Sequence, residues 1–127
     1  MNWRRRFFLV IAAIFLALPQ AWAEDWQVVW KDSMREVRVD RDSVRAEGKM
    51  LEYWYSDEED AIVDWMEHRY YVVSDCEGNR MKHVTVYDPA TGESKPVANS
   101  EWADVTYDPE DPIKLMHYEV CRGSISG

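Results

Sequence analysis

Two cysteines, Cys76 and Cys121, carry the most distinctive side-chain chemistry of this 127-residue chain. Thiol pairs that catalyse redox reactions or bind metals often occur in a C-x-x-C motif, but here the two cysteines lie far apart and that motif is absent. A distant pair is typical of one structural disulfide if the chain is exported, as the N-terminal residues described below indicate. We therefore predict a disulfide between Cys76 and Cys121, with a redox or metal-binding pair as the alternative.

The three histidines, His68, His83 and His117, are candidate ligands for zinc. We expect His68 and His83 on neighbouring strands, nearly opposite one another across a hairpin. Zinc sites usually have four ligands, and no fourth ligand is evident in the sequence. Ordinary strand and helix histidines are the favoured interpretation, so the sequence predicts no metal site and no cofactor.

An acidic segment between residues 56 and 64 is a second candidate for metal binding. Its carboxylates are Asp57, Glu58, Glu59, Asp60 and Asp64. Calcium prefers several such oxygen ligands, but the segment lacks the D-x-[DN]-x-[DN]-G frame of a calcium loop. We therefore expect residues 56–64 to form an exposed, solvated loop whose charge aids solubility.

Motifs for catalysis are missing from the chain. It contains no G-x-S-x-G elbow, no H-E-x-x-H pair and no glycine-rich phosphate loop. Pairs of carboxylates do occur, but a chain with 24 acidic residues forms such pairs by composition alone. The sequence therefore favours a protein that is not an enzyme.

The charge balance limits the classes of binding partner that we expect for this chain. The chain has 24 acidic and 15 basic residues, which give a formal net charge of −9. This charge repels the phosphates of nucleic acids and of anionic membranes, so neither is an expected partner. An acidic surface favours a basic protein partner instead.

Aromatic residues supply a candidate binding surface. The chain has 7 tryptophans and 7 tyrosines, and most of those after residue 23 are expected in the core. Along a strand, Tyr53 and Tyr55 share one face while Trp54 lies on the other, so one of the two faces must be partly outward. We predict a protein-binding surface at Tyr53 and Tyr55.

The N-terminal residues have the composition of a secretory signal peptide. Arginines at positions 4–6 precede an apolar run over residues 7–18, and Ala21-Trp22-Ala23 matches a cleavage site. We predict a cleaved signal peptide over residues 1–23 and a single domain over residues 24–127. The apolar run is shorter than the roughly 20 residues that span a bilayer, so no stable membrane anchor is expected after cleavage.

The same segment indicates where the protein goes. No cysteine lies near the cleavage site, so a lipid anchor of the bacterial lipoprotein kind is not expected. Export by threading is favoured, although the arginines also match a twin-arginine signal loosely. The predicted location is the periplasm, with the cell surface or secretion as alternatives.

Periodicity in the remaining chain predicts a mainly β fold. We expect strands at residues 26–30, 36–40, 50–55, 65–74, 81–87 and 93–98, with turns at 77–79 and 88–92. A C-terminal helix is expected to start with Asp111 as its cap and Pro112 in its first turn, and to end at Gly123. The predicted fold class is α+β, mainly β: an antiparallel meander sheet of about five to six strands with the helix packed on it and tied by one disulfide.

Several short motifs occur along the mature chain in a particular order. They are Trp26, the run V-D-R-D-S-V at 39–44, Gly48 before Trp54, Asp75-Cys76, V-Y-D at 86–88 with Gly92, Trp102 and Cys121. This order resembles the surface-adhesin protein E family of Gram-negative bacteria. The resemblance implies a sheet backed by a C-terminal helix, a disulfide that joins helix to sheet, and a tendency to form a homodimer.

The resemblance also implies a function. The adhesin of this family is displayed on the outer membrane, where it binds host matrix and serum proteins, but it carries a lipid anchor that this leader does not support. We therefore expect an exported, non-enzymatic protein-binding module of the bacterial envelope. A periplasmic ion-binding or enzyme-accessory protein is the alternative.

Overall fold

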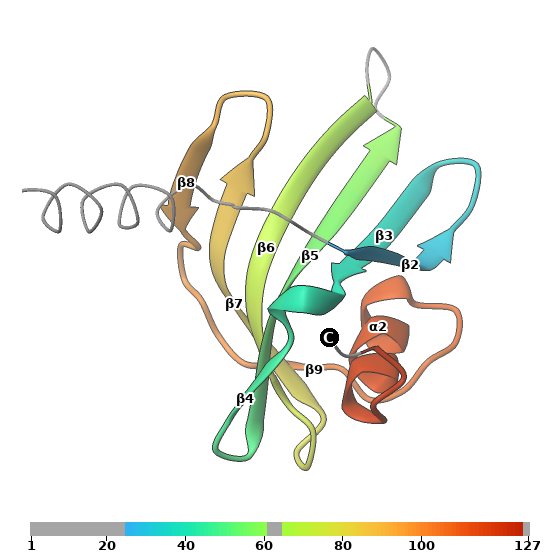
Figure 1. Cartoon of the computed structure of the whole chain (residues 1–127), viewed down its shortest axis with the longest axis vertical. Coiled ribbons are helices and arrows are strands. Elements are labelled where there is room, and N and C mark those ends of the chain that lie inside the picture. The colour runs from blue at the N-terminus through green and yellow to red at the C-terminus, as the bar shows by residue number, and fades with distance from the viewer. Residues whose placement is uncertain (1–24, 61–64, 126–127) are drawn as a thin grey trace, which may run out of the picture.

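The structure is a computed structural model that describes residues 25–60 and 65–125 (Figure 1). These residues form an eight-stranded antiparallel sheet and a C-terminal α-helix. In chain order the elements are β2 (Trp26–Lys31), β3 (Arg35–Asp40), the 3-10 helix η1 (Arg41–Ser43), β4 (Arg45–Glu47), β5 (Met50–Asp60), β6 (Trp65–Asp75), β7 (Arg80–Asp88), β8 (Glu93–Pro96), β9 (Ala103–Asp104) and α2 (Pro112–Cys121). This architecture confirms the predicted fold class.

No helix within the described ranges has the length and apolar character needed to span a bilayer. The predicted signal peptide, residues 1–23, lies outside these ranges.

Six strands form one continuous path, in the order β2-β3-β5-β6-β7-β8. This path is the meander that the sequence predicts. Two further strands extend it: β4 pairs with the start of β5, and β9 pairs with the start of β7. With three and two residues, they are too short to show an alternating pattern in the sequence.

The acidic segment is the main difference from the predicted fold. Residues 56–60 were expected in a loop, but they continue β5 to Asp60 and pair with β6 along their whole length. Asp57 and Glu58 both form ion pairs with arginines of β3, the neighbouring strand. These pairs neutralise the carboxylates, so their charge does not prevent strand formation. Asp64 lies outside the described residues.

The helix α2 begins and ends as its sequence predicts. Asp111 caps it by accepting hydrogen bonds from the amides of Ile113 and Lys114, at 3.0 and 3.1 Å. Pro112 occupies the first turn, where the missing amide hydrogen costs nothing. After the last turn, Gly123 takes a φ of +81°, which favours glycine. The predicted disulfide between Cys76 and Cys121 is present and ties the helix to the end of β6.

The core lies between α2 and one face of the sheet. The helix contributes Met116 and Val120, and lies beside β2 and β3 (Figure 1). The buried apolar residues of the core are Val37, Val39, Tyr53, Tyr55, Val72, Met81, Val105, Met116, Val120 and Ile125. The five strand residues of β3, β5 and β6 among them lie on one face, because residues two apart along a strand point the same way. We call this the inner face of the sheet.

Candidate functional site

The inner face continues beyond the core along β5 and β6. On β5 the alternation runs from Tyr53 and Tyr55, which are 0% and 2% exposed, to Asp57 and Glu59. On β6, Met66 lies opposite Glu59, and its side chain is 50% exposed. This end of the inner face is therefore accessible to solvent, whereas the other end is buried in the core.

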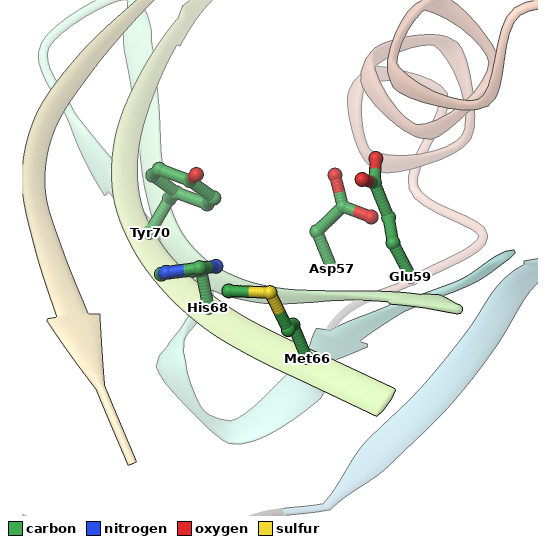
Figure 2. Close-up of a pocket in the computed structure, with 5 residues that line it drawn as sticks. All are labelled: Asp57, Glu59, Met66, His68 and Tyr70. Atoms are coloured by element: carbon green, nitrogen blue, oxygen red, sulfur yellow. The ribbon is translucent and has the colours of Figure 1, made fainter. Parts of the chain in front are cut away.

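Five residues at this accessible end line a pocket, and we call them the open half-face. They are Asp57, Glu59, Met66, His68 and Tyr70. Figure 2 shows their side chains on the same side of the two strands. The pocket has a volume of about 130 Å³. Sites for drug-sized molecules measure roughly 300–1,000 Å³, so this pocket has room for about one side chain or a small ion.

An arginine from the neighbouring strand controls the charge of the pocket. Arg35 on β3 donates to both carboxylate oxygens of Asp57, at 2.9 and 2.6 Å. Its Nε also lies 3.7 Å from a carboxylate oxygen of Glu59. The hydrogen bond to Asp57 raises the pKa of Arg35, which keeps the guanidinium charged. One positive charge thus faces two carboxylates, and the pocket keeps one net negative charge.

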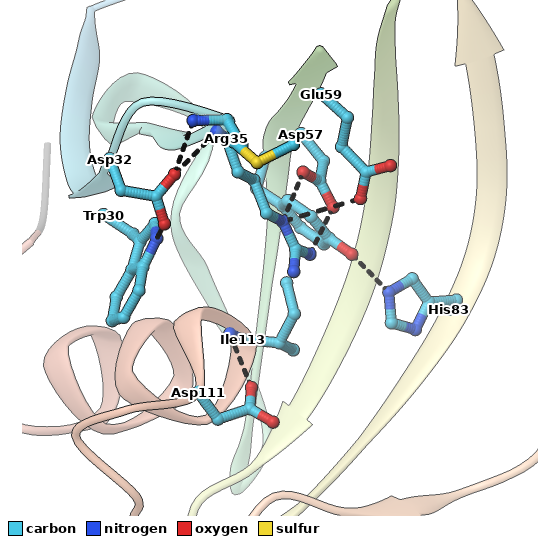
Figure 3. Close-up of polar contacts among 10 residues, drawn as sticks. Trp30, Asp32, Arg35, Asp57, Glu59, His83, Asp111 and Ile113 are labelled. Carbon is cyan, nitrogen blue, oxygen red and sulfur yellow. Dashed lines mark hydrogen bonds and ion pairs between the residues drawn. The ribbon is translucent and has the colours of Figure 1, made fainter. Parts of the chain in front are cut away.

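The β2–β3 turn positions Arg35. Asp32 accepts hydrogen bonds from the amides of Met34 and Arg35, at 2.8 and 2.9 Å, and from the indole of Trp30 at 3.0 Å (Figure 3). The bond from the Met34 amide makes the largest contribution to lowering the pKa of Asp32. A carboxylate that holds two successive backbone amides fixes a turn locally. The start of β3, and with it Arg35, is therefore held in register beside Asp57.

Aromatic rings form the wall of the site toward β7. Tyr70 stacks on Tyr55 with ring centroids 5.2 Å apart, and the imidazole of His83 meets Tyr70 edge-on at the same distance. Tyr55 and His83 share a hydrogen bond of 2.5 Å (Figure 3). Burial lowers the pKa of His83 and raises that of Tyr55, so both groups are neutral near pH 7. The wall therefore offers ring faces but no charge.

The three histidines are divided between this wall and the core. His83 pairs with Val72 on β6, so it does not lie opposite His68 as predicted. The ring centroids of His68 and His83 are 6.4 and 5.2 Å from that of Tyr70. His117 belongs to α2 and lies in the core, 2% exposed. Within residues 25–60 and 65–125, no group of three His, Cys, Asp or Glu side chains has the geometry to hold a metal ion.

The predicted binding surface at Tyr53 and Tyr55 is wrong. Both side chains are buried, because they belong to the inner face where the core packs. Their hydroxyl groups are satisfied internally: Tyr53 shares a 2.8 Å hydrogen bond with Ser74, and Tyr55 bonds to His83. Burial of a tyrosine is tolerated when its hydroxyl has such a partner. The accessible part of this face begins one step further along β5, at Asp57.

Arg35, Met66 and Tyr70 are site residues that the sequence alone does not predict. The sequence holds one signal for this face, because Tyr53, Tyr55, Asp57 and Glu59 occupy every second position, as residues on one face of a strand do. In the structure the strand continues past Tyr55, and Asp57 lies opposite His68 and Glu59 opposite Met66. The run of acidic residues hid this alternation.

A second polar cluster lies in the core, at His117. Its Nδ1 is 3.0 Å from the hydroxyl of Ser74, which is also bonded to Tyr53. All three side chains are at most 2% exposed, so no substrate reaches this serine and histidine. The cluster satisfies polar groups that the core would otherwise leave unpaired.

The buried histidines make stability depend on pH. Burial lowers the pKa of His117 and of His83 below the ordinary value of 6.5. Between the lowered pKa and 6.5, the unfolded chain binds more protons than the folded chain. We expect the free energy of unfolding, measured with urea from about pH 8 to about pH 5, to be constant above pH 7 and to fall below about pH 6.5. A double variant, His83→Gln with His117→Gln, should show a flatter profile over that range, and a profile that rises toward pH 5 would contradict the assignment.

No protein-family model, curated protein or solved structure matches this chain. The resemblance to the surface-adhesin protein E family therefore stays a prediction from short motifs. The disulfide between Cys76 and Cys121 is a structural observation and indicates an oxidising, non-cytoplasmic compartment. The geometry of the open half-face is thus the main basis for an argument about function.

Proposed function

We propose that this chain is an exported, non-enzymatic module that binds a protein partner on the open half-face. The observation that carries the proposal is the division of the inner face into a part buried in the core and an accessible part that ends at Met66. The accessible part combines an exposed apolar side chain, aromatic rings and uncompensated charge. Aromatic and methionine side chains with a polar rim are enriched at protein interfaces.

The size of the pocket favours a protein over a small organic molecule. At about 130 Å³ it encloses roughly one side chain, so a ligand would leave most of its surface outside. A partner protein can place one side chain in the pocket and make its other contacts on the surrounding strands. Such anchor residues commonly supply much of the binding energy.

The setting of this function is the bacterial envelope. The disulfide supports export to an oxidising compartment, and the resemblance to the surface-adhesin protein E family supports an envelope role in a Gram-negative bacterium. Periplasmic residence is our first choice, with adhesin-like display at the cell surface as the variant that the resemblance suggests. The ion-binding alternative has less support, because Asp57 already forms an ion pair with Arg35.

Site-specific photo-crosslinking in living cells tests this proposal. A photoreactive amino acid placed at Met66 should capture a discrete protein adduct, because the side chain borders the pocket and is 50% exposed. Val28 provides a matched control, since it is also apolar, 47% exposed, and pairs with Arg38 on the opposite face of the sheet. Adding Glu59→Lys to the Met66 probe should reduce the adduct. An adduct that forms at Val28 but not at Met66 would contradict the proposal.

A further inference from the structure

Strand β6 extends beyond its neighbour β7. It pairs with β5 from Trp65 onward, whereas its pairing with β7 begins at Arg69, opposite Tyr87. Within the described part of the chain, residues 65–68 therefore have a strand on one side only. An edge of this kind presents unpaired backbone N–H and C=O groups. It lies next to the pocket, because Met66 and His68 belong to both.

The other edges of the sheet are less suited to accept a strand. The outer edge of β8 is short and contains Pro96, which cannot donate a backbone hydrogen bond. The outer edge of β2 is irregular, since its register with β3 shifts between Val28 and Trp30. Bulges, prolines and short length are the usual protections of edge strands against added strands. Residues 65–68 of β6 also form a short edge, but they are in regular register with β5 and contain neither a bulge nor a proline.

The pocket adds a preference for charge. Its carboxylates, on Asp57 and Glu59, outnumber the one guanidinium of Arg35, and the Glu59 side chain is 63% exposed. The ring of Tyr70 forms part of the lining. Carboxylates and aromatic faces together suit a cationic group. An anionic group is disfavoured, because Arg35 is already occupied by Asp57.

Strand spacing restricts the side chain that reaches these carboxylates. A strand added beside β6 would lie two strand spacings, or roughly 10 Å, from β5. A side chain on the added strand must therefore extend past Met66 and His68 to approach Glu59. Lysine and arginine combine this length with a positive charge.

We infer that the partner binds as an extended segment that adds to residues 65–68 of β6 and places a lysine or arginine side chain in the pocket of the open half-face. This inference rests on the proposed function and specifies its partner. Backbone hydrogen bonds would supply affinity, and the pocket would select one side chain, as in other cases of strand addition. Neighbouring residues of the segment would point to the opposite face of the sheet.

A titration with short peptides tests the inference. The probe is the peptide acetyl-Thr-Val-Lys-Val-Thr-amide, added at millimolar concentration to the ¹⁵N-labelled, disulfide-bonded protein and followed by NMR. We expect amide shifts at Met66, Glu67 and His68, and slower hydrogen exchange of the edge amides. Replacing the lysine of the peptide by norleucine should weaken binding by up to about fivefold, which is the upper end of what one exposed ion pair contributes. N-methylation of the peptide backbone at one valine should abolish the slowed exchange.

Variants of the protein separate charge recognition from general effects. Glu59→Gln should weaken the binding of the lysine peptide by the same factor and leave the affinity for the norleucine peptide unchanged. Glu47→Gln is the matched control, since Glu47 is an exposed strand residue of β4 outside the pocket. This variant should bind both peptides with the affinity of the unchanged protein. Equal affinity for the lysine and norleucine peptides, shifts centred on β2, or no shifts at all would each overturn the inference.

The two proposals fail in different ways. A Met66 adduct in cells combined with equal binding of both peptides would leave the open half-face as the binding site and refute the basic strand. Selective binding of the lysine peptide without a Met66 adduct would support recognition of basic strands and count against a resident protein partner in those cells.

Discussion

Replacing Cys76 and Cys121 together by alanine is expected to lower the free energy of unfolding by about 4 kcal/mol. The disulfide closes a segment in which the two cysteines are 45 positions apart, so its loss frees a long loop in the unfolded chain. A loss of this size is a large part of the roughly 5–15 kcal/mol that stabilises a typical domain. Urea denaturation of the oxidised protein and of the double variant measures the difference.

Reduction supplies the control for this experiment. A thiol reductant should destabilise the native protein by a similar amount and have no effect on the double variant. The disulfide lies at the end of β6, and Met66 lies near its start, roughly 30 Å away along the strand. Folded molecules of the variant should therefore still bind the lysine peptide. A loss of less than 1 kcal/mol would show that the unfolded chain is already compact without the disulfide.

Local signals in the sequence are sufficient to predict the helices and strands whose partners are close in the chain. The α2 helix is an example, since Asp111, Pro112 and Gly123 mark its ends by effects that act within a few residues. The six strands of the meander are another, because turn residues separate them and antiparallel neighbours follow one another. The cysteine pair was predictable from its count and from the expected compartment.

Contacts between distant residues account for what the sequence did not reveal. The sequence predicts Asp57 and Glu58 in a loop, because nothing near them in the chain balances their charge. Their partners, Arg35 and Arg38, are 22 and 20 residues away. The strand alternation of Tyr53 and Tyr55 was predicted correctly, but which face is buried depends on Ser74, His83 and the helix. The candidate site combines both effects, so its position could not be derived from local patterns.

The second large effect is expected from Met116→Ala in α2, which should lower the free energy of unfolding by about 2–5 kcal/mol. Met116 is 0% exposed and belongs to the buried apolar core between the helix and the sheet. Truncation removes buried apolar atoms and leaves a cavity that the surrounding strands fill only in part. Thermal or urea unfolding of the oxidised protein measures the change.

Met34→Ala is the matched control, because it makes the same chemical change at a side chain that is 60% exposed in the β2–β3 turn. Exposed substitutions of this kind usually change stability by no more than about 0.5 kcal/mol. The contrast between the two variants tests whether the packing of α2 against the sheet stabilises the fold in addition to the disulfide.

Because α2 lies beside β2 and β3 while the pocket is formed by β5 and β6, Met116→Ala should lower stability without changing the affinity of the folded protein for the lysine peptide. Equal stabilities of the two methionine variants would mean that the disulfide alone holds the helix in place.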